Sequence, residues 1–372
     1  MLDKTTSDRV IRYKTNSKKE AFANELRSRV RAYFRENNIS TFATTSVKFK
    51  ALIGFVLWIT VYTLLLTNAF SENLILLLLG FLAIGFINIF LALNVMHDSC
   101  HNAFTGNPKT DRILGYTMNF IGGNRYLFTM MHNAHHQFVN IHGIDVTLET
   151  HGLFRFTPHE PWKPKHRWQH VYTPIIYSLA MIHWILIKDF KWYFGELHIG
   201  NRKNIEHPRS EMWILLISKA FYLSTTLVIP LLVIHSPWWW IVLAWIHLHI
   251  LPSLVFSLLF QITHVYEGTD YPMPNDKGCI ENNYFIHVLE TTADFSRKNR
   301  LITWITGGLN IHVVHHLFPT MNHGHYIPVA QIVKDTADEY GIHYKENKNF
   351  FTALVLHMRI LKHLSKPETS QQ

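Results

Sequence analysis

The sequence predicts an all-α integral membrane protein, in which four transmembrane helices form two hairpins and carry a cytosolic helical cap that holds a metal site. Three observations lead to this prediction: four long apolar runs, a low content of charged residues, and three histidine clusters in the polar segments. Of the 372 residues, 48% are hydrophobic and only 16% are charged, whereas soluble domains carry about 25% charged residues. The composition therefore indicates a membrane protein.

The first two apolar runs cover residues 51–70 and 74–95. Each is long enough to cross a hydrocarbon core of ~30 Å as a helix. The polar residues 71–73 leave room only for a tight turn, so the two runs form a hairpin whose outer ends face the same side. The second run ends just before His97.

A second hairpin is predicted from the apolar runs 212–235 and 238–262, which Ser236 and Pro237 separate. Between the two hairpins, residues 175–187 are apolar but too few to span the membrane. Tryptophan and lysine flank this piece, so we expect a helix that lies in the plane of the membrane interface.

The net charge of +9 with neutral histidines comes mostly from the segments outside the apolar runs. The positive-inside rule places these segments, and with them both termini, in the cytoplasm. Because the basic residues flank apolar runs, they favour anionic lipid headgroups or an acidic substrate over nucleic acid.

We expect a basic cytosolic N-terminal arm (1–50), a membrane domain (51–345) and a C-terminal tail (346–372). Without a visible signal peptide or retention signal, the chain is expected in a bacterial inner membrane rather than the endoplasmic reticulum.

Three histidine clusters are the most specific feature of the chain. They are His97-Asp98-Ser99-Cys100-His101, His132-Asn133-Ala134-His135-His136 and His312-Val313-Val314-His315-His316. Helical residues three and four apart share a face, so each cluster can point its imidazoles at one spot. Eight imidazoles exceed the ligands of one ion and suit two adjacent ions of iron, zinc, copper or nickel. Chance pairing among 26 histidines is the alternative, but it does not explain why the clusters fall in segments that return to one membrane face.

Three further residues are candidates for the same site. His264 follows the fourth apolar run as His97 follows the second, so it is a candidate ninth ligand, although a helix-end histidine facing lipid headgroups is an alternative. Asp98 and Asn133 stand between candidate ligands. A ligating imidazole usually donates its other N–H to a carboxylate or carbonyl, so we expect Asp98 and Asn133 to orient the ligands.

These motifs resemble those of the membrane fatty acid desaturases, which carry one H-D-x-x-H box and two H-x-x-H-H boxes. The similarity is greatest to the front-end branch, and it covers roughly residues 50–345. Residues 260–268 (FQITHVYEG) resemble the family segment whose histidine is an additional iron ligand. The other matching residues are Asn140, Gly143 and Asp145 after the second box, Gly307, Gly308, Leu309 and Asn310 before the third, and Leu317, Phe318 and Pro319 after it.

The resemblance implies an enzyme that introduces a double bond into a fatty acyl chain with O2 and external electrons. It also implies two non-haem Fe²⁺ ions, a substrate that is an acyl-CoA or a membrane lipid, and membrane lipids around the protein. The chain has two cysteines and no His-Pro-Gly-Gly haem signature, so a separate ferredoxin or cytochrome b type protein is expected to supply the electrons. The implied iron ligands are His97, His101, His132, His135, His136, His264, His312, His315 and His316.

Two alternatives stay open at this point. Related di-iron hydroxylases and ketolases carry similar boxes, and the same oxidant can add oxygen instead of removing hydrogen. The second alternative is a metal or haem carrier, such as a zinc transporter or a membrane cytochrome. A transporter would place its ligands near the middle of the membrane, whereas these clusters lie outside the runs. The chain also departs from the front-end pattern, which usually has Gln at the position of His312 and Pro at the position of Val146, so the position of the double bond does not follow from the resemblance.

Overall fold

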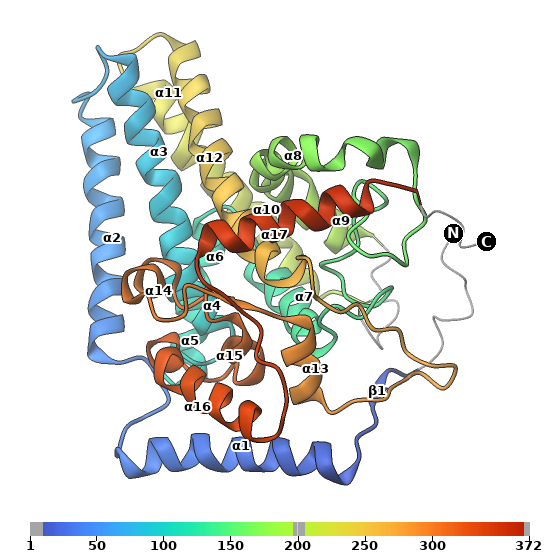
Figure 1. Cartoon of the computed structure of the whole chain (residues 1–372). Helices are drawn as coiled ribbons and strands as arrows, with labels where there is room; N and C mark the ends of the chain where they lie inside the picture. Colours follow the sequence, from blue (N-terminus) through green and yellow to red (C-terminus); the bar gives the residue numbers. More distant parts are fainter. Residues whose placement is uncertain (1–9, 196–198, 200–204, 368–372) are drawn as a thin grey trace.

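The computed structural model describes residues 10–195, 199 and 205–367, and this part of the chain is almost entirely helical (Figure 1). The N-terminal third contains α1 (Ser17–Glu36), α2 (Thr45–Leu66), α3 (Leu74–Leu91), the π-helical turn η2 (Ala92–Met96), α4 (His97–Cys100), α5 (Pro108–Gly115), α6 (Thr117–Phe120) and α7 (Arg125–Gln137). The middle third contains η3 (Pro164–Trp168), α8 (Gln169–His183), η4 (Trp184–Lys188), α9 (Asp189–Phe194), α10 (Arg209–Leu223), η5 (Ser224–Val228), α11 (Ile229–Val233) and α12 (Trp238–His264). The last third contains α13 (Tyr284–Thr291), α14 (Arg300–Thr306), α15 (His312–Leu317), η6 (His323–His325), α16 (Tyr326–Glu339) and α17 (Phe350–Leu364).

Two short parallel strand pairs connect distant parts of the chain. Strand β1 (Arg12–Tyr13) pairs with β2 (Cys279–Ile280), with Arg12 opposite Cys279. Strand β3 (Asp294–Phe295) pairs with β4 (Glu346–Asn347), with Asp294 opposite Glu346. Both pairs lie among the polar segments and hold the ends of the chain against the segment that follows α12.

Five helical segments are long and apolar enough to cross a membrane. Four of them overlap the predicted apolar runs, although the first ends at Leu66 and the third run's helix ends at Val233, a few residues before the predicted ends. The fifth segment joins η3, α8, η4 and α9 end to end. This fifth segment is longer than the short interfacial helix that we predicted, because a π-helical turn at η4 continues the helix instead of ending it. The segments are Thr45–Leu66, Leu74–Cys100, Pro164–Phe194, Arg209–Val233 and Trp238–His264.

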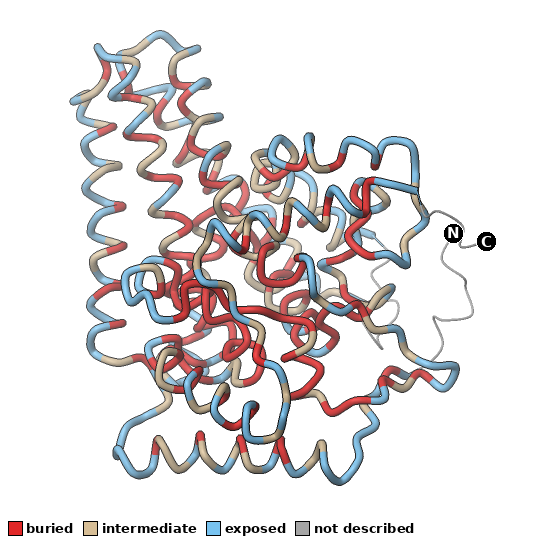
Figure 2. Tube along the Cα trace, viewed as in Figure 1, coloured by how far each residue is buried: buried red, intermediate tan, exposed pale blue. Residues whose placement is uncertain are grey.

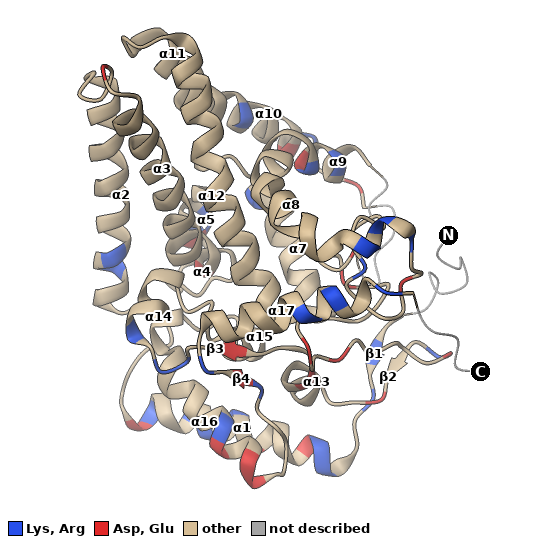
Figure 3. Cartoon of the chain, turned by 45° about the horizontal axis from the view of Figure 1, so that its top comes forward, with Lys and Arg blue, Asp and Glu red and all other residues tan. Residues whose placement is uncertain are grey.

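Helices α2, α3 and α12 run side by side, whereas α8 lies at an angle to them and packs on α12 (Figure 1). The outer parts of α2, α3, α11 and α12 carry almost no charged residues, which gather instead around α1, α16 and the side of α9 (Figure 3). This distribution of charge divides the protein into a membrane part, formed by the helices with few charges, and a polar part.

Close packing of α3 on α12 fixes the position of the helix ends that lead to the histidine clusters. At Gly85, a Cβ atom would lie 2.2 Å from the carbonyl oxygen of Leu248, so only glycine permits this approach. The indole of Trp58 donates a hydrogen bond to Asn88 Oδ1 at 3.0 Å and ties α2 to the same helix. As a result, α3 through η2 and α12 bring His97 and His264 into the same region of the molecule.

One side of α1, which lies in the predicted N-terminal arm, is buried against the rest of the protein. Buried residues recur every four positions along α1, at Phe22, Leu26, Val30 and Phe34, and they pack in one cluster with α15 and α16. Figure 2 shows buried positions on the inner side of α1 and exposed positions on its outer side. Burying such a side chain contributes about 1.5–3 kcal/mol, so α1 is an integral part of the fold. In the predicted C-terminal tail, α17 likewise packs on α8 and α12.

Candidate metal centre

All nine histidines that the sequence singled out meet in the interior. Each is at most 7% exposed. Four parts of the chain bring them there: the end of α3 through η2 and α4, helix α7, the end of α12, and helix α15. Their role as metal ligands stays a prediction, but the geometry brings together every residue that this prediction requires.

Eight of these imidazoles fall into two groups of four. Within each group, one ring nitrogen of every member lies within 4.8 Å of the corresponding nitrogens of the others. The first group is His97, His101, His132 and His315, and the second is His135, His264, His312 and His316. The second and third boxes each contribute to both groups, so the two groups are neighbours.

His136 lies between the two groups. Its Nε2 is 3.1 Å from Nε2 of His132, which belongs to the first group. Its ring centroid lies 4.3 Å from that of His316, in the second group, and 4.4 Å from that of His315, in the first. His136 can therefore contribute to either group.

The arrangement of ring nitrogens fits bound metal ions. The Nε2 atoms of His312 and His264 are 2.8 Å apart, and those of His97 and His132 are 3.0 Å apart. Two ligand nitrogens at ~2.1 Å from one ion and at right angles to each other lie about 3 Å apart. Nε2 of His101 and Nε2 of His315 are buried without a hydrogen-bond partner among the described residues. Such buried polar atoms are costly unless a partner is supplied, and a cation is the partner that this donor set accommodates.

The imidazoles of the centre are held in the neutral form that binds metals. Burial lowers the pKa of His101 to about 4. Burial, followed by the neighbouring imidazoles, lowers the pKa of His132, His136, His312, His315 and His316 well below the ordinary value. At neutral pH their lone pairs are therefore free to coordinate a cation.

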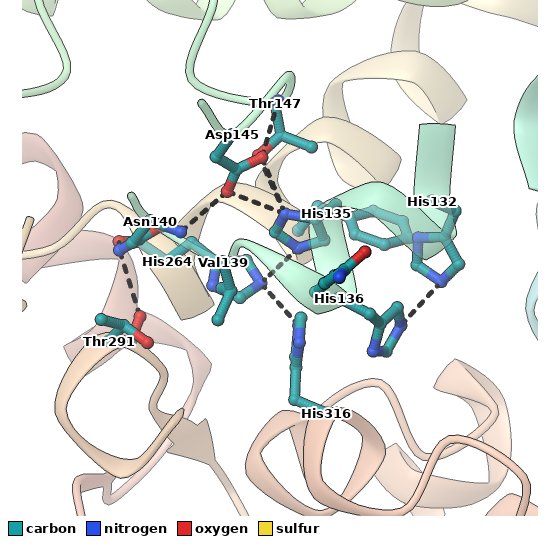
Figure 4. Close-up of polar contacts among 12 residues, drawn as sticks. His132, His135, His136, Val139, Asn140, Asp145, Thr147, His264, Thr291 and His316 are labelled. Atoms are coloured by element: carbon teal, nitrogen blue, oxygen red, sulfur yellow. Dashed lines mark hydrogen bonds and ion pairs between the residues drawn. The ribbon is translucent and has the colours of Figure 1, made fainter. Parts of the chain in front are cut away.

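A buried carboxylate orients the second box (Figure 4). Nδ1–H of His135 donates to Asp145 Oδ2 at 2.9 Å, which turns Nε2 toward His264 at 3.2 Å. Burial alone would raise the pKa of Asp145, but His135 and the N–H groups of Thr147 and Asn140 keep it below its usual range. Loss of such a supporting hydrogen bond typically costs ~10–100-fold in metal affinity.

Asn140 links the second box to the end of α12. It adopts a left-handed backbone conformation with φ of 54°, which Asn tolerates better than most residues. Its backbone N–H donates to Asp145 Oδ2 at 2.8 Å, and its side-chain amide donates to the carbonyl oxygens of His264 at 2.8 Å and Thr291 at 3.1 Å. This position and Asp145 belong to the motif that follows the second box, although sequence reasoning assigned them no role.

The third box is held by a carboxylate and a tight backbone approach. The N–H of Val313 donates to Asp294 Oδ1 at 2.9 Å, and Tyr326 Oη lies 3.2 Å from Nδ1 of His315. Gly307 has a φ of 59°, and a Cβ there would lie 2.3 Å from the carbonyl oxygen of Leu93. Glycine at this position lets the loop before α15 press against the turn that precedes His97.

We expected Asp98 to orient a candidate ligand, but its hydrogen bonds go to other residues. Its Oδ2 accepts hydrogen bonds from Nδ1–H of His323 at 2.5 Å and from Asn322 Nδ2 at 2.6 Å. Lys50 Nζ donates to Nε2 of His323 at 2.8 Å. Asp98 therefore ties the first box to η6 and, through Lys50, to α2. The sequence carried no signal for Asn322 and His323 as partners, because they lie more than two hundred residues further along the chain.

The expectation for Asn133 was wrong. Its side chain is exposed, and no hydrogen bond of this side chain occurs among the described residues. Successive helical residues are about 100° apart around the axis, so the face that carries His132, His135 and His136 excludes Asn133.

Comparisons with known proteins agree with the motifs and the buried histidines. The fatty acid desaturase family profile matches residues 73–348. The chain is 31% identical over 361 residues to the sn-1 linoleoyl-lipid 6-desaturase of Arthrospira platensis, covering 95% of this chain and 96% of that protein. It is 30% identical over 362 residues to the sn-1 linoleoyl-lipid 6-desaturase of Synechocystis sp., covering 94% and 97%. It is also 30% identical over 349 residues to the acyl-lipid (8-3)-desaturase of Mortierella alpina, covering 92% of this chain and 77% of that protein. The chain belongs to the fatty acid desaturase family.

Proposed function

We propose that this fatty acid desaturase acts on acyl chains carried by membrane lipids and uses two iron ions, O2 and electrons from a separate protein. The observation that carries the proposal is the convergence of nine buried imidazoles at the ends of two membrane helices. The relatives described above are named for linoleoyl-lipid and acyl-lipid substrates, which supports a lipid-linked acyl chain over an acyl-CoA.

Iron is the proposed metal because the reaction reduces O2, and zinc has no redox chemistry. His97, His101, His132 and His315 would hold one ion, and His135, His264, His312 and His316 the other, with His136 available to either. When bound, the iron pair supplies the activation of O2 and the abstraction of hydrogen. The protein supplies neutral, oriented imidazoles in an interior that excludes water.

An apolar cavity next to the centre offers a path for the acyl chain. It lies between η2, α6, α8 with η4, and α12, and its lining includes Ala92, Met96, Met118, Ile185 and Phe256. Its volume of about 30 Å³ is only two to three times the ~10–15 Å³ that lets a cavity hold one water molecule, so an entering chain must displace side chains. Methionine suits this role because its unbranched side chain adapts easily.

Phe128 connects this cavity to the histidines. Its ring stacks on the ring of His132 at 5.0 Å between centroids and lies 6.1 Å from Trp184, which lines the cavity. An acyl chain lying among these residues would pass close to the first group of histidines.

We propose four membrane crossings with the metal centre and both termini on the cytoplasmic side, and residues 51–345 as the catalytic domain. The three boxes meet in one place, so an even number of crossings must separate His136 from His312. Helices α10 with α11 and α12 provide two crossings. The segment Pro164–Phe194 would then lie against the membrane part without crossing it, which agrees with its angle to α12 (Figure 1). A bacterial inner membrane is the proposed location.

Expression of this chain in cells whose membranes contain linoleoyl lipids tests the activity. We expect new lipid-linked fatty acids that have lost two hydrogens, with the double bond located by mass spectrometry. His135→Ala serves as the inactive control. A product that has gained one oxygen atom would instead assign the chain to the related hydroxylases.

His312 is expected to be a true iron ligand, because its Nε2 lies 2.8 Å from Nε2 of His264 and 3.2 Å from Nε2 of His316. His312→Ala should therefore lower iron affinity by ~10–100-fold or more, measured as iron per chain in purified protein. His312→Gln should retain part of the iron, because an amide binds weakly or through water. Asn133→Ala, on the exposed face of α7, is the matched control and should keep full iron. Full iron in His312→Ala would make His312 a bystander.

Filling the apolar cavity should block the acyl chain and leave the metal centre intact. Ile185 lines the cavity and is 4% exposed, whereas its neighbour Leu186 is 42% exposed. Ile185→Trp should reduce turnover of long acyl chains about tenfold or more, because the indole would occupy the space that the chain needs. Leu186→Trp should leave turnover unchanged, and iron content should be normal in both. Equal turnover by the two variants would show that the acyl chain binds elsewhere.

Reporter fusions can count the crossings. We expect fusions at Lys109 and Lys298 to report the cytoplasmic side, and fusions at Glu72 and Ser236 the opposite side. If Pro164–Phe194 crosses the membrane as a fifth span, Ser236 and Lys298 would exchange sides, and the four-crossing topology would be abandoned.

A further inference from the structure

A basic groove lies between α1 and the segments of α13 and α15 that pack beneath it, at the end of the molecule opposite the turn between α2 and α3 (Figure 1). Arg31 and Arg35 are exposed and Arg27 is half-buried. None of the ion pairs among the described residues involves these three arginines, whereas Arg29 pairs with Glu25 and with Glu339 of α16, each at 2.6 Å. We call this feature the α1 groove; it has a volume of about 910 Å³ and is lined by Arg27, Arg31, Arg35, Phe285, Leu317 and Phe318, among others.

The lining of the α1 groove is positive and apolar. Among the described residues it includes no Asp or Glu. Its apolar floor comes from α13 and from the end of α15, and the guanidinium of Arg27 lies over the ring of Phe285 at 4.3 Å. A protein surface of this kind attracts and holds an acidic partner.

The floor of the groove is continuous with the metal centre. Phe285 and Phe318 pack with their ring centroids 5.8 Å apart, and Phe318 follows His316 by two residues. Next to Phe285, the hydroxyl of Tyr284 donates to the carbonyl oxygens of both His136 and His316, each at 3.0 Å. The bottom of the groove is therefore joined to two histidines of the centre by short covalent and hydrogen-bonded connections.

The proposed function requires electrons from outside. Removing two hydrogens from adjacent carbons, with reduction of O2, balances as R–CH2–CH2–R′ + O2 + 2 H⁺ + 2 e⁻ → R–CH=CH–R′ + 2 H2O. The substrate supplies two of the four electrons that O2 takes up, and a reductant must supply the other two. Because the histidines are buried, that reductant must approach a surface that is coupled to them.

We propose that the α1 groove is the docking site of an acidic, one-electron carrier protein, and that Phe318 and Phe285 form the contact through which electrons reach the metal centre. The inference rests on the proposed function, which creates the need for a reductant. Anionic lipid headgroups are the other source of negative charge, but α1 lies away from the charge-free parts of α2, α3 and α12 (Figure 3). A soluble partner is therefore the occupant that the position of the groove favours.

Charge reversal at the two exposed arginines tests the site in the iron-loaded enzyme. The variant Arg31→Glu/Arg35→Glu is compared with Lys277→Glu/Lys298→Glu, which makes the same change in net charge at exposed positions elsewhere. A reduced [2Fe–2S] ferredoxin and a soluble cytochrome b domain serve as carriers, and the absorbance of the carrier gives the rate of electron transfer. We expect Arg31→Glu/Arg35→Glu to lower the second-order rate about tenfold or more at low salt. The difference should shrink toward 1 M salt, where charges are screened beyond ~3 Å.

Two further measurements separate the possible failures. Enzyme reduced chemically, freed of reductant and exposed to O2 should yield the same unsaturated product in wild type and in both variants. Absence of product from the wild type would count against the proposed function, while the carrier absorbance still tests the groove. An unchanged carrier rate in Arg31→Glu/Arg35→Glu, or an equal loss in the control, would overturn the docking site. Weaker binding to anionic vesicles with an unchanged carrier rate would overturn it too and assign the arginines to lipid headgroups.

Discussion

Nine imidazoles are buried so that their ring nitrogens face one another, and the rest of the structure depends on this arrangement. A buried polar atom without a partner costs roughly 1–3 kcal/mol, and several of these nitrogens have no partner among the described residues. Neighbouring imidazoles also cannot all carry protons at separations near 3 Å. Bound cations would stabilise this set of neutral imidazoles, and metal binding would in turn stabilise the fold.

The surrounding residues make this burial possible. Asp145 fixes the tautomer and direction of His135, Asp294 holds the backbone of the third box, and Asp98 fastens the first box to His323. Each carboxylate is itself buried. These groups hold each box against neighbouring segments of the chain rather than against solvent, so the ring nitrogens are left to face the centre.

Substrate and electrons would reach the centre from different sides of the protein. The apolar cavity opens among α3, α6, α8 and α12, which belong to or adjoin the membrane part. The α1 groove is formed by α1, α13 and α15, which belong to the polar part. This separation would keep a hydrophobic chain and an acidic protein on surfaces suited to each.

The sequence by itself determined the four apolar runs, the three boxes and the candidacy of His264, because apolar length and helical spacing are local properties. The family assignment followed from the same local motifs, and the comparisons confirmed it. Only the tertiary structure decided the partners of Asp98, the outward direction of Asn133, the place of His136 between the two groups and the burial of α1. It also showed Pro164–Phe194 as one long helical segment. These features depend on which surfaces of distant segments pack together, and the spacing of residues along one segment does not specify that.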